Sequence, residues 1–235
     1  MIPLKDDVPS QSPPVVTVLL IALNVVAFLY QMSLEFGGPA IPRGGMPPAE
    51  AFVFEFGVIP CRLTGSCPAD FPTPLLTIFT SMFLHGGLFH IAGNMLYLWI
   101  FGNNVEDTLG HGRFLLFYLL SGVAAAVGQT MVSPTSTVPM IGASGAVSGV
   151  LGAYLLLFPY ATILTLITFG FFIRFVHIPA IIVLGFWIVV QFANGFLSLG
   201  MRGEGGGVAW FAHVGGFVAG LALLFILRPR RSRRL

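Results

Sequence analysis

The sequence predicts an all-α membrane protein, a bundle of six transmembrane helices in which the fourth helix is short. Of the residues, 56% are hydrophobic and only 9% are charged, and the mean hydropathy is +0.91. A soluble domain carries about 25% charged residues. The composition therefore excludes a cytosolic globular domain, a disordered chain, a nucleic-acid-binding protein and a small disulfide scaffold. The acidic residues all lie at the ends of apolar runs or between them, so none falls in the middle of a predicted span.

Apolar runs supply the spans, because a helix crosses the hydrocarbon core of a membrane with about 20 residues. The spans are predicted at residues 14–34, 88–104, 113–131, 144–158, 178–196 and 208–227. The first run is too long for the apolar part of a signal peptide and is expected to be retained.

Residues 35–73 are rich in Gly and Pro and form the first outer loop. Residues 73–84 are apolar but too short to cross, so they lie in the membrane interface or re-enter the membrane, and the loop is partly embedded. Residues 159–176 are predicted to be an interfacial connection on the inner face, with a tilted or broken span as the alternative. For Cys61 and Cys67, a disulfide and two free thiols both remain open.

The distribution of basic residues predicts the orientation. An even number of spans places both termini on one side, and cytoplasmic loops carry an excess of Lys and Arg. The basic residues favour cytoplasmic termini, which gives a cytoplasmic tail at 1–13, a membrane domain at 14–227 and a basic cytoplasmic tail at 228–235. A bacterial-type plasma (inner) membrane is expected. The basic tail at 228–235 is interpreted as a positive-inside anchor that holds this end of the chain on the cytoplasmic side, so no nucleic-acid partner is expected.

Ser144 stands at the start of the short fourth span, in the sequence GASG at residues 142–145. If Pro159 marks the inner face, this helix begins roughly 10 Å below the outer face. Its first backbone N–H groups have no helical partner and can hold an oxyanion in the recess. Gly142 and Gly145 allow a substrate backbone to approach closely. The same pattern is also a common helix cap, so taken alone it does not decide the function.

His213 in the sixth span supplies a base for this serine. Gly216 and Gly220 follow it at helical spacing, and the fourth span has its own stripe of small residues, Ser144, Ser148 and Gly152. Small residues let two membrane helices pack closely, which brings the imidazole toward the hydroxyl. Because no acidic residue is near enough in the sequence pattern to orient the imidazole, the prediction is a Ser–His dyad. A packing histidine that hydrogen-bonds a carbonyl group is the alternative.

Three polar residues near the head of the second span complete the pattern. His90 and Asn94 are four residues apart and share a helix face, where both can donate hydrogen bonds to an oxyanion. His85 is expected to have a structural role, bonding the loop backbone. A metal site built from His85, His90 and His213 is the alternative. It would lack a carboxylate ligand and the HExxH spacing, so no metal and no cofactor are predicted.

These residues together resemble the rhomboid family of intramembrane serine proteases. The matching motifs are GASG at 142–145, HGGLFHIAGN at 85–94 and AHVGGFVAG at 212–220, and they follow one another on the expected spans. The resemblance covers about residues 14–227. It implies a rhomboid-like bundle, Ser144 as nucleophile and His213 as general base, with His90, Asn94 and the Ser144 N–H stabilising the oxyanion. It also implies that the fifth helix admits substrate sideways, with Phe186 and Trp187 near the gate.

The sequence departs from the family pattern at two places. Many members carry an aromatic residue one turn after the nucleophile, stacked on the histidine, where this chain has Ser148. The Trp-Arg pair often found in the first outer loop is also absent. Neither departure removes a catalytic group.

The predicted function is cleavage of transmembrane segments near the outer face, so the expected partners are single-span membrane proteins and the lipid bilayer. A catalytically inactive relative that binds membrane clients is the alternative, although both the serine and the histidine are present. A transporter would need carboxylates inside the spans or paired broken helices. The natural substrate and the oligomeric state are left open.

Overall fold

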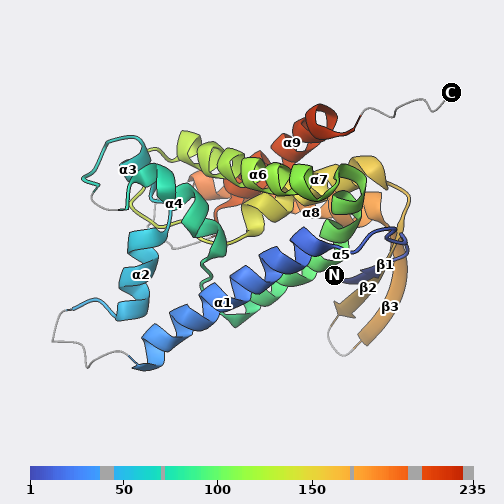
Figure 1. Cartoon of the computed structure of the whole chain (residues 1–235), viewed down its shortest axis with the longest axis horizontal. Coiled ribbons are helices and arrows are strands. Elements are labelled where there is room, and N and C mark those ends of the chain that lie inside the picture. Colours follow the sequence, from blue (N-terminus) through green and yellow to red (C-terminus); the bar gives the residue numbers. More distant parts are fainter. Residues whose placement is uncertain (38–44, 70–71, 170–171, 201–207, 230–235) are drawn as a thin grey trace.

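The structure, a computed structural model, describes residues 1–37, 45–69, 72–169, 172–200 and 208–229. Its long helices are α1 (Val15–Gly37), α5 (Leu88–Leu109), α6 (His111–Val132), α7 (Ser144–Leu157), α8 (Ala180–Gly200) and α9 (Trp210–Leu227). Short helices α2 (Pro48–Phe56), α3 (Pro60–Leu63) and α4 (Pro74–Thr80), with the 3₁₀ turn η1 (Ser81–Phe83), connect α1 to α5. Three strands, β1 (Ile2–Asp6), β2 (Thr162–Phe169) and β3 (Phe172–Pro179), lie at the end of the molecule opposite α2, α3 and α4 (Figure 1).

The long helices lie at all six predicted positions. Within the described residues, α1, α6, α8 and α9 are each long and apolar enough to cross a membrane. The segment Pro74–Phe83 and α5 make a fifth candidate span that is bent by 84°. Helix α7 has only 14 residues, as short as the sequence predicts. The chain is therefore a multi-pass membrane protein with four or five candidate spans by length and composition, and the full count of six crossings stays a prediction.

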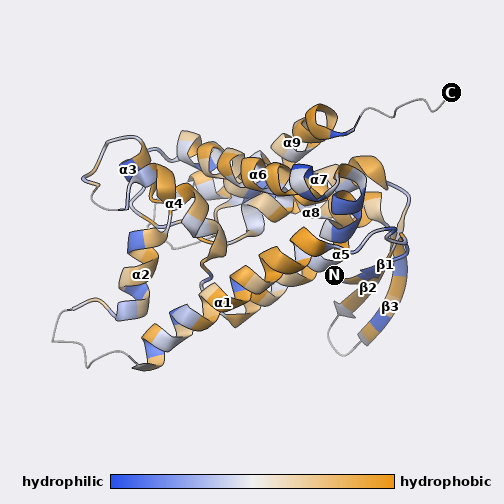
Figure 2. Ribbon diagram, in the orientation of Figure 1, coloured by the Kyte–Doolittle hydropathy of each residue, from blue (hydrophilic) through white to orange (hydrophobic). Residues whose placement is uncertain are grey.

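Hydrophobic residues predominate in the long helices, whereas hydrophilic residues appear in α2 and near the ends of several helices (Figure 2). Val26 of α1, Val189 of α8 and Phe225 of α9 are each more than half exposed. A soluble protein rarely leaves such continuous apolar surface uncovered. These faces are the ones that the acyl chains of a bilayer would cover.

The three-stranded antiparallel sheet was not predicted. Its order is β1–β2–β3, with Ile2 opposite Leu166 and Ile163 opposite Ile178. Ile163 and Thr165 alternate with more exposed neighbours and are fully buried, as the two-residue period of a strand requires. The interfacial connection expected at 159–176 is thus a hairpin, and it is neither a tilted nor a broken span. The core of the bundle is all-helical as predicted, and the sheet is an addition at its end.

Buried polar contacts fasten the first strand and the first helix to the bundle. The Glu106 carboxylate accepts hydrogen bonds from the backbone N–H groups of Val16 and Thr17, both at 2.8 Å, and so caps the first turn of α1. Asp6 accepts hydrogen bonds from the Tyr154 hydroxyl, at 2.7 Å, and from the Asn104 amide. Burial raises the pKa of the Asp6 carboxyl above its usual value. The two donors therefore offset part of the cost of a charge at this position.

Tyr154→Phe is expected to destabilise the fold by about 1–2 kcal/mol, because it removes one donor from a half-buried carboxylate. Thermal unfolding in detergent, followed by intrinsic fluorescence, measures the change. Tyr160→Phe is the matched control, because Tyr160 is largely exposed and makes no side-chain hydrogen bond among the described residues. Equal melting temperatures for the two variants would contradict a stabilising role for the Tyr154–Asp6 contact.

Candidate active site

A serine and a histidine from two different helices meet inside the bundle. Ser144 is the first residue of α7, and His213 lies in the first turn of α9. The Nε2 atom of His213 is 2.8 Å from Oγ of Ser144. Both side chains are partly buried. A serine hydroxyl hydrogen-bonded to an imidazole nitrogen is the arrangement in which histidine can take the serine proton.

Glycines make this contact possible by letting α7 and α9 approach one another. A Cβ atom added at Gly216 would overlap the carbonyl oxygen of Gly145, and one added at Gly220 would overlap that of Gly149. On its other side α7 also lies close to α6, because a Cβ atom at Gly145 would lie 2.5 Å from the Ala125 Cβ. The small-residue stripes of the sequence therefore meet as expected.

Two side chains of α5 lie beside the backbone that precedes the serine. Gly142 has φ +119°, and a Cβ atom there would be 2.7 Å from His90 Nε2 and 3.6 Å from Asn94 Nδ2. Only glycine fits this conformation and this gap. The Gly86 N–H donates to His90 Nδ1 at 3.3 Å, which leaves Nε2 to carry the proton of the neutral ring. His90 and Asn94 thus both present N–H donors beside Gly142, two residues before Ser144.

Asn94 is the more informative of the two donors. It is 8% exposed, and its Nδ2 atom is buried with no hydrogen-bond partner among the described residues. A buried donor without a partner is costly, and it is unusual unless a ligand or water fills the place. An anionic oxygen of a substrate held near Gly142 would supply the missing acceptor.

His85 lies close to these donors. The sequence predicted that its side chain bonds the loop backbone, but the structure shows no such hydrogen bond from the ring. Its ring packs edge-on against His90 with the centroids 5.0 Å apart, and both of its ring nitrogens are buried without partners in the described part of the chain. The side chain of Gln31 in α1 instead holds the loop. It accepts from the His85 N–H at 2.9 Å and donates to the His85 carbonyl at 3.2 Å.

Helix α8 supplies two contacts to His213 that were not predicted from the sequence. The Nδ1 atom of His213 is 2.7 Å from Oε1 of Gln191, and the Trp187 ring lies 5.9 Å from the imidazole at 38°. Trp187, expected near a gate, therefore packs on the histidine in place of an aromatic at position 148. Ser148 itself donates to the Ser144 carbonyl at 2.6 Å. Phe186, the other expected gate residue, is more than half exposed.

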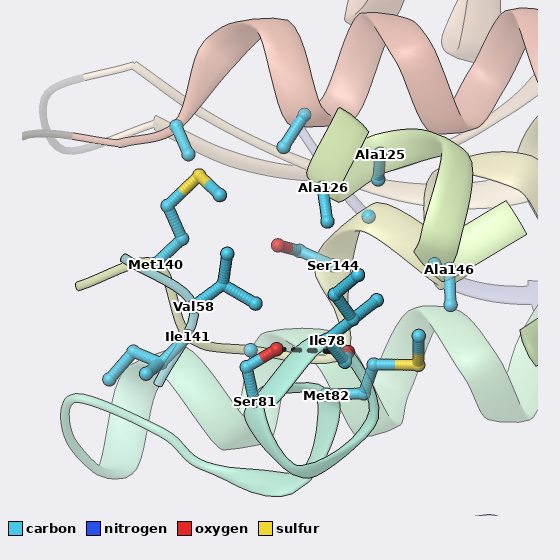
Figure 3. Close-up of a pocket in the computed structure, with 15 residues that line it drawn as sticks. Val58, Ile78, Ser81, Met82, Ala125, Ala126, Met140, Ile141, Ser144 and Ala146 are labelled. Carbon is cyan, nitrogen blue, oxygen red and sulfur yellow. Dashed lines mark hydrogen bonds between the residues drawn. The ribbon is translucent and has the colours of Figure 1, made fainter. Parts of the chain in front are cut away.

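A hollow of about 40 Å³ opens beside the serine (Figure 3). Small residues form one wall, among them Gly122, Ala125 and Ala126 of α6, and Met82 and Ile78 close another. Figure 3 shows the Ser144 side chain directed into the space between these walls. The hollow is therefore small.

The side chains of the described residues do not form a metal-binding site. Among the residues that the structure describes, no group of three or more His, Cys, Asp or Glu side chains is arranged to hold a metal ion. Cys61 and Cys67, the pairing of which was open, form a disulfide. It links the second residue of α3 to the turn that follows this helix.

Fold and sequence together define a multi-pass helical membrane protein with polar groups gathered inside its bundle. The family model described as "Rhomboid domain" matches residues 72–230, which is more than half of the chain. The chain belongs to the rhomboid family.

Curated relatives agree with this assignment. The chain is 30% identical over 174 residues to "Rhomboid protein 1, mitochondrial" of Saccharomyces cerevisiae, an alignment that covers 71% of this chain and 47% of that protein. It is 37% identical over 143 residues to "Rhomboid protease GluP" of Bacillus subtilis, covering 61% and 24%. It is 29% identical over 158 residues to "Putative rhomboid protease YdcA" of the same bacterium, covering 67% and 69%. The chain thus spans about half of the yeast relative and a quarter of GluP.

Proposed function

We propose that this protein is an intramembrane serine endopeptidase that cleaves transmembrane segments of single-span membrane proteins through a Ser144–His213 dyad. The observation that carries the proposal is the 2.8 Å contact between His213 Nε2 and Ser144 Oγ. Family membership and relatives named as rhomboid proteases support the same activity. No cofactor is needed for this chemistry.

Peptide-bond cleavage would begin when His213 accepts the hydroxyl proton of Ser144 and Oγ attacks the scissile carbonyl carbon. The carbonyl oxygen becomes negatively charged in the tetrahedral intermediate. His213 then gives its proton to the leaving amine, and Ser144 keeps the acyl group as an ester. Water, deprotonated by His213, hydrolyses the ester and restores the serine.

The developing oxyanion would be held by N–H donors that are already in place. His90 Nε2, Asn94 Nδ2 and the Ser144 backbone N–H at the start of α7 all lie around Gly142. Donors fixed before the reaction stabilise the transition state without reorganising. The unpartnered Asn94 amide supports this role.

The hollow beside Ser144, about 40 Å³ and lined by small residues, favours substrates with a small residue next to the scissile bond. In the proposed orientation both termini are cytoplasmic. Ser144 then lies toward the outer side, because the hollow beside it is lined by Val58, Ile78 and Ser81 of the segment that runs from α2 to η1. Helices α2 to α4 lie at the end of the molecule opposite the sheet (Figure 1). Cleavage would occur near the outer face.

The direct test uses purified protein in liposomes and a single-span substrate with an Ala-Gly junction near its outer end. Cleavage by the wild type and not by Ser144→Ala would support the proposal. If neither protein cleaves, a fluorophosphonate probe tests Ser144 without any need for a substrate. Failure of both cleavage and labelling would reject the protease and favour an inactive protein that binds membrane clients.

Asn94→Ala is expected to lower kcat by roughly 10²–10³-fold, the usual loss of one oxyanion donor. Steady-state cleavage of the same substrate measures this change. Asn103→Ala is the matched control, because Asn103 lies on the same helix and its amide donates to Ser10 far from the serine. An unchanged kcat for Asn94→Ala would remove this residue from the oxyanion site.

A further inference from the structure

The side-chain amide of Gln191 in α8 contacts His213 but takes no part in the proton transfers of the Ser144–His213 dyad. Gln191 is 6% exposed, and its Oε1 atom lies 2.7 Å from His213 Nδ1. Its side chain reaches the imidazole on the side opposite to Ser144, since Nδ1 and Nε2 are the two different ring nitrogens. We propose that Gln191 is a positioning residue that fixes the tautomer and orientation of His213. This inference rests on the proposed function.

The chemistry of a neutral imidazole explains why this position matters. One ring nitrogen carries the proton and the other can accept one. To take a proton from Ser144, His213 must keep Nε2 free and hold its own proton on Nδ1. An acceptor beside Nδ1 favours that tautomer, and the Gln191 carbonyl oxygen is such an acceptor. Here an amide occupies the position that a carboxylate takes in a catalytic triad.

Helix α8 holds Gln191 at this place with a stripe of residues that faces α9. Trp187, Gln191 and Gly195 follow one another at four-residue intervals and therefore share one face. Trp187 packs on the His213 ring, and a Cβ atom at Gly195 would lie 3.2 Å from the Trp210 Cβ atom of α9. The opposite face carries exposed apolar residues such as Val189, Phe192 and Phe196. The stripe thus seats α8 against the start of α9.

Through this contact α8 orients the catalytic base His213, in addition to forming one wall of the helical bundle. Any outward displacement of α8 would withdraw Gln191 and Trp187 from His213 together. His213 would then lose both its hydrogen-bond acceptor and its packing partner while Ser144, on α7, stays in place. Catalytic competence therefore depends on α8 lying against α9.

The test compares three variants in the liposome assay, with kcat and KM measured separately. Gln191→Met keeps the size of the side chain but removes the acceptor, and it is expected to lower kcat by about 10- to 100-fold, the effect of one hydrogen bond to a group that becomes charged. KM and the melting temperature should stay close to those of the wild type. Gln191→Glu, which keeps an acceptor oxygen whether or not it is ionised, should restore most of the lost kcat.

Asn194→Leu is the matched control, because Asn194 is an amide on the same helix that makes no hydrogen bond with His213. Its kcat should equal that of the wild type. A wild-type kcat for Gln191→Met, a Glu variant no better than the Met variant, or an equal loss in Asn194→Leu would each overturn the proposal.

A second measurement, of the protonation of the His213 ring nitrogens, does not depend on substrate cleavage. Nuclear magnetic resonance of ¹⁵N-histidine-labelled protein reports which ring nitrogen carries the proton, with the His213 signals assigned by their loss in His213→Ala. The wild type should show His213 protonated on Nδ1, and Gln191→Met should shift it toward the other tautomer. If the wild type neither cleaves the substrate nor is labelled by the fluorophosphonate probe, but the tautomer depends on Gln191, the protease proposal fails and the positioning role stands. If the wild type cleaves and the tautomer is unchanged in Gln191→Met, only the positioning role fails.

Discussion

Ser144→Ala and His213→Ala are each expected to lower kcat by roughly 10⁴–10⁶-fold, because nucleophile and base act as one unit. Removal of the hydroxyl leaves no atom to form the acyl-enzyme. Removal of the imidazole leaves a hydroxyl that is a poor nucleophile. Single-turnover cleavage in liposomes, with an excess of enzyme over substrate, measures rates low enough to quantify both losses.

The double variant Ser144→Ala/His213→Ala separates a dyad from two independent contributions. Its rate should lie close to that of the single variants, since either substitution already disables the unit. Melting temperatures measured in parallel control for misfolding. Losses that add in the double variant, or substantial residual cleavage by Ser144→Ala, would contradict the dyad.

Gly220→Ala is expected to lower both the rate and the stability, although this residue lies two turns from His213 in α9. The added methyl group would overlap the backbone of Gly149, which cannot move aside as a flexible side chain can. Helices α7 and α9 must separate, and a displacement of about 1 Å at a catalytic contact can cost about 100-fold in rate. A stability loss of about 1–3 kcal/mol should accompany it, as for other overpacked cores.

Gly185→Ala provides the matched control for this substitution. It is also a helical glycine, in α8, but a Cβ atom there would meet nothing within 4 Å. Alanine is favoured over glycine in a helix, so this variant should match or slightly exceed the wild-type melting temperature. Fluorophosphonate labelling of Ser144 should slow in Gly220→Ala and not in Gly185→Ala. Equal labelling rates would show that the glycine contact does not set the position of the dyad.

The helices and the meeting of α7 with α9 could be predicted because lipid makes the sequence signals strong. Apolar runs mark the helices. Gly216 and Gly220, at helical spacing, indicate a face on which two membrane helices pack closely. The Ser144–His213 contact follows from those two stripes. The short fourth helix could likewise be predicted, because Pro159 limits it.

The sheet and the α8 contacts could not be predicted in the same way. Strand β1 is short, and its partner β2 is far along the chain, so no local pattern joins the two. The polar character of Gln191 inside an apolar run was a usable signal, because an amide in a span usually has a partner. Its partner, however, depends on the rotation of α8 about its axis, which the sequence does not determine. Whether Cys61 and Cys67 form a disulfide could not be predicted for a similar reason, since spacing alone does not determine the distance between two thiols.

The pairing of β1 with β2 imposes an order on how the protein is built. Ile2 pairs with Leu166, so α1, α5, α6 and α7 all leave the ribosome before the partner of this strand exists. Contacts between such distant segments form slowly, because a long loop must close first. Until then β1 has an unpaired edge, which can join other strands and cause aggregation. Closing the sheet would therefore be a late step of biogenesis, following assembly of the helices that carry Ser144.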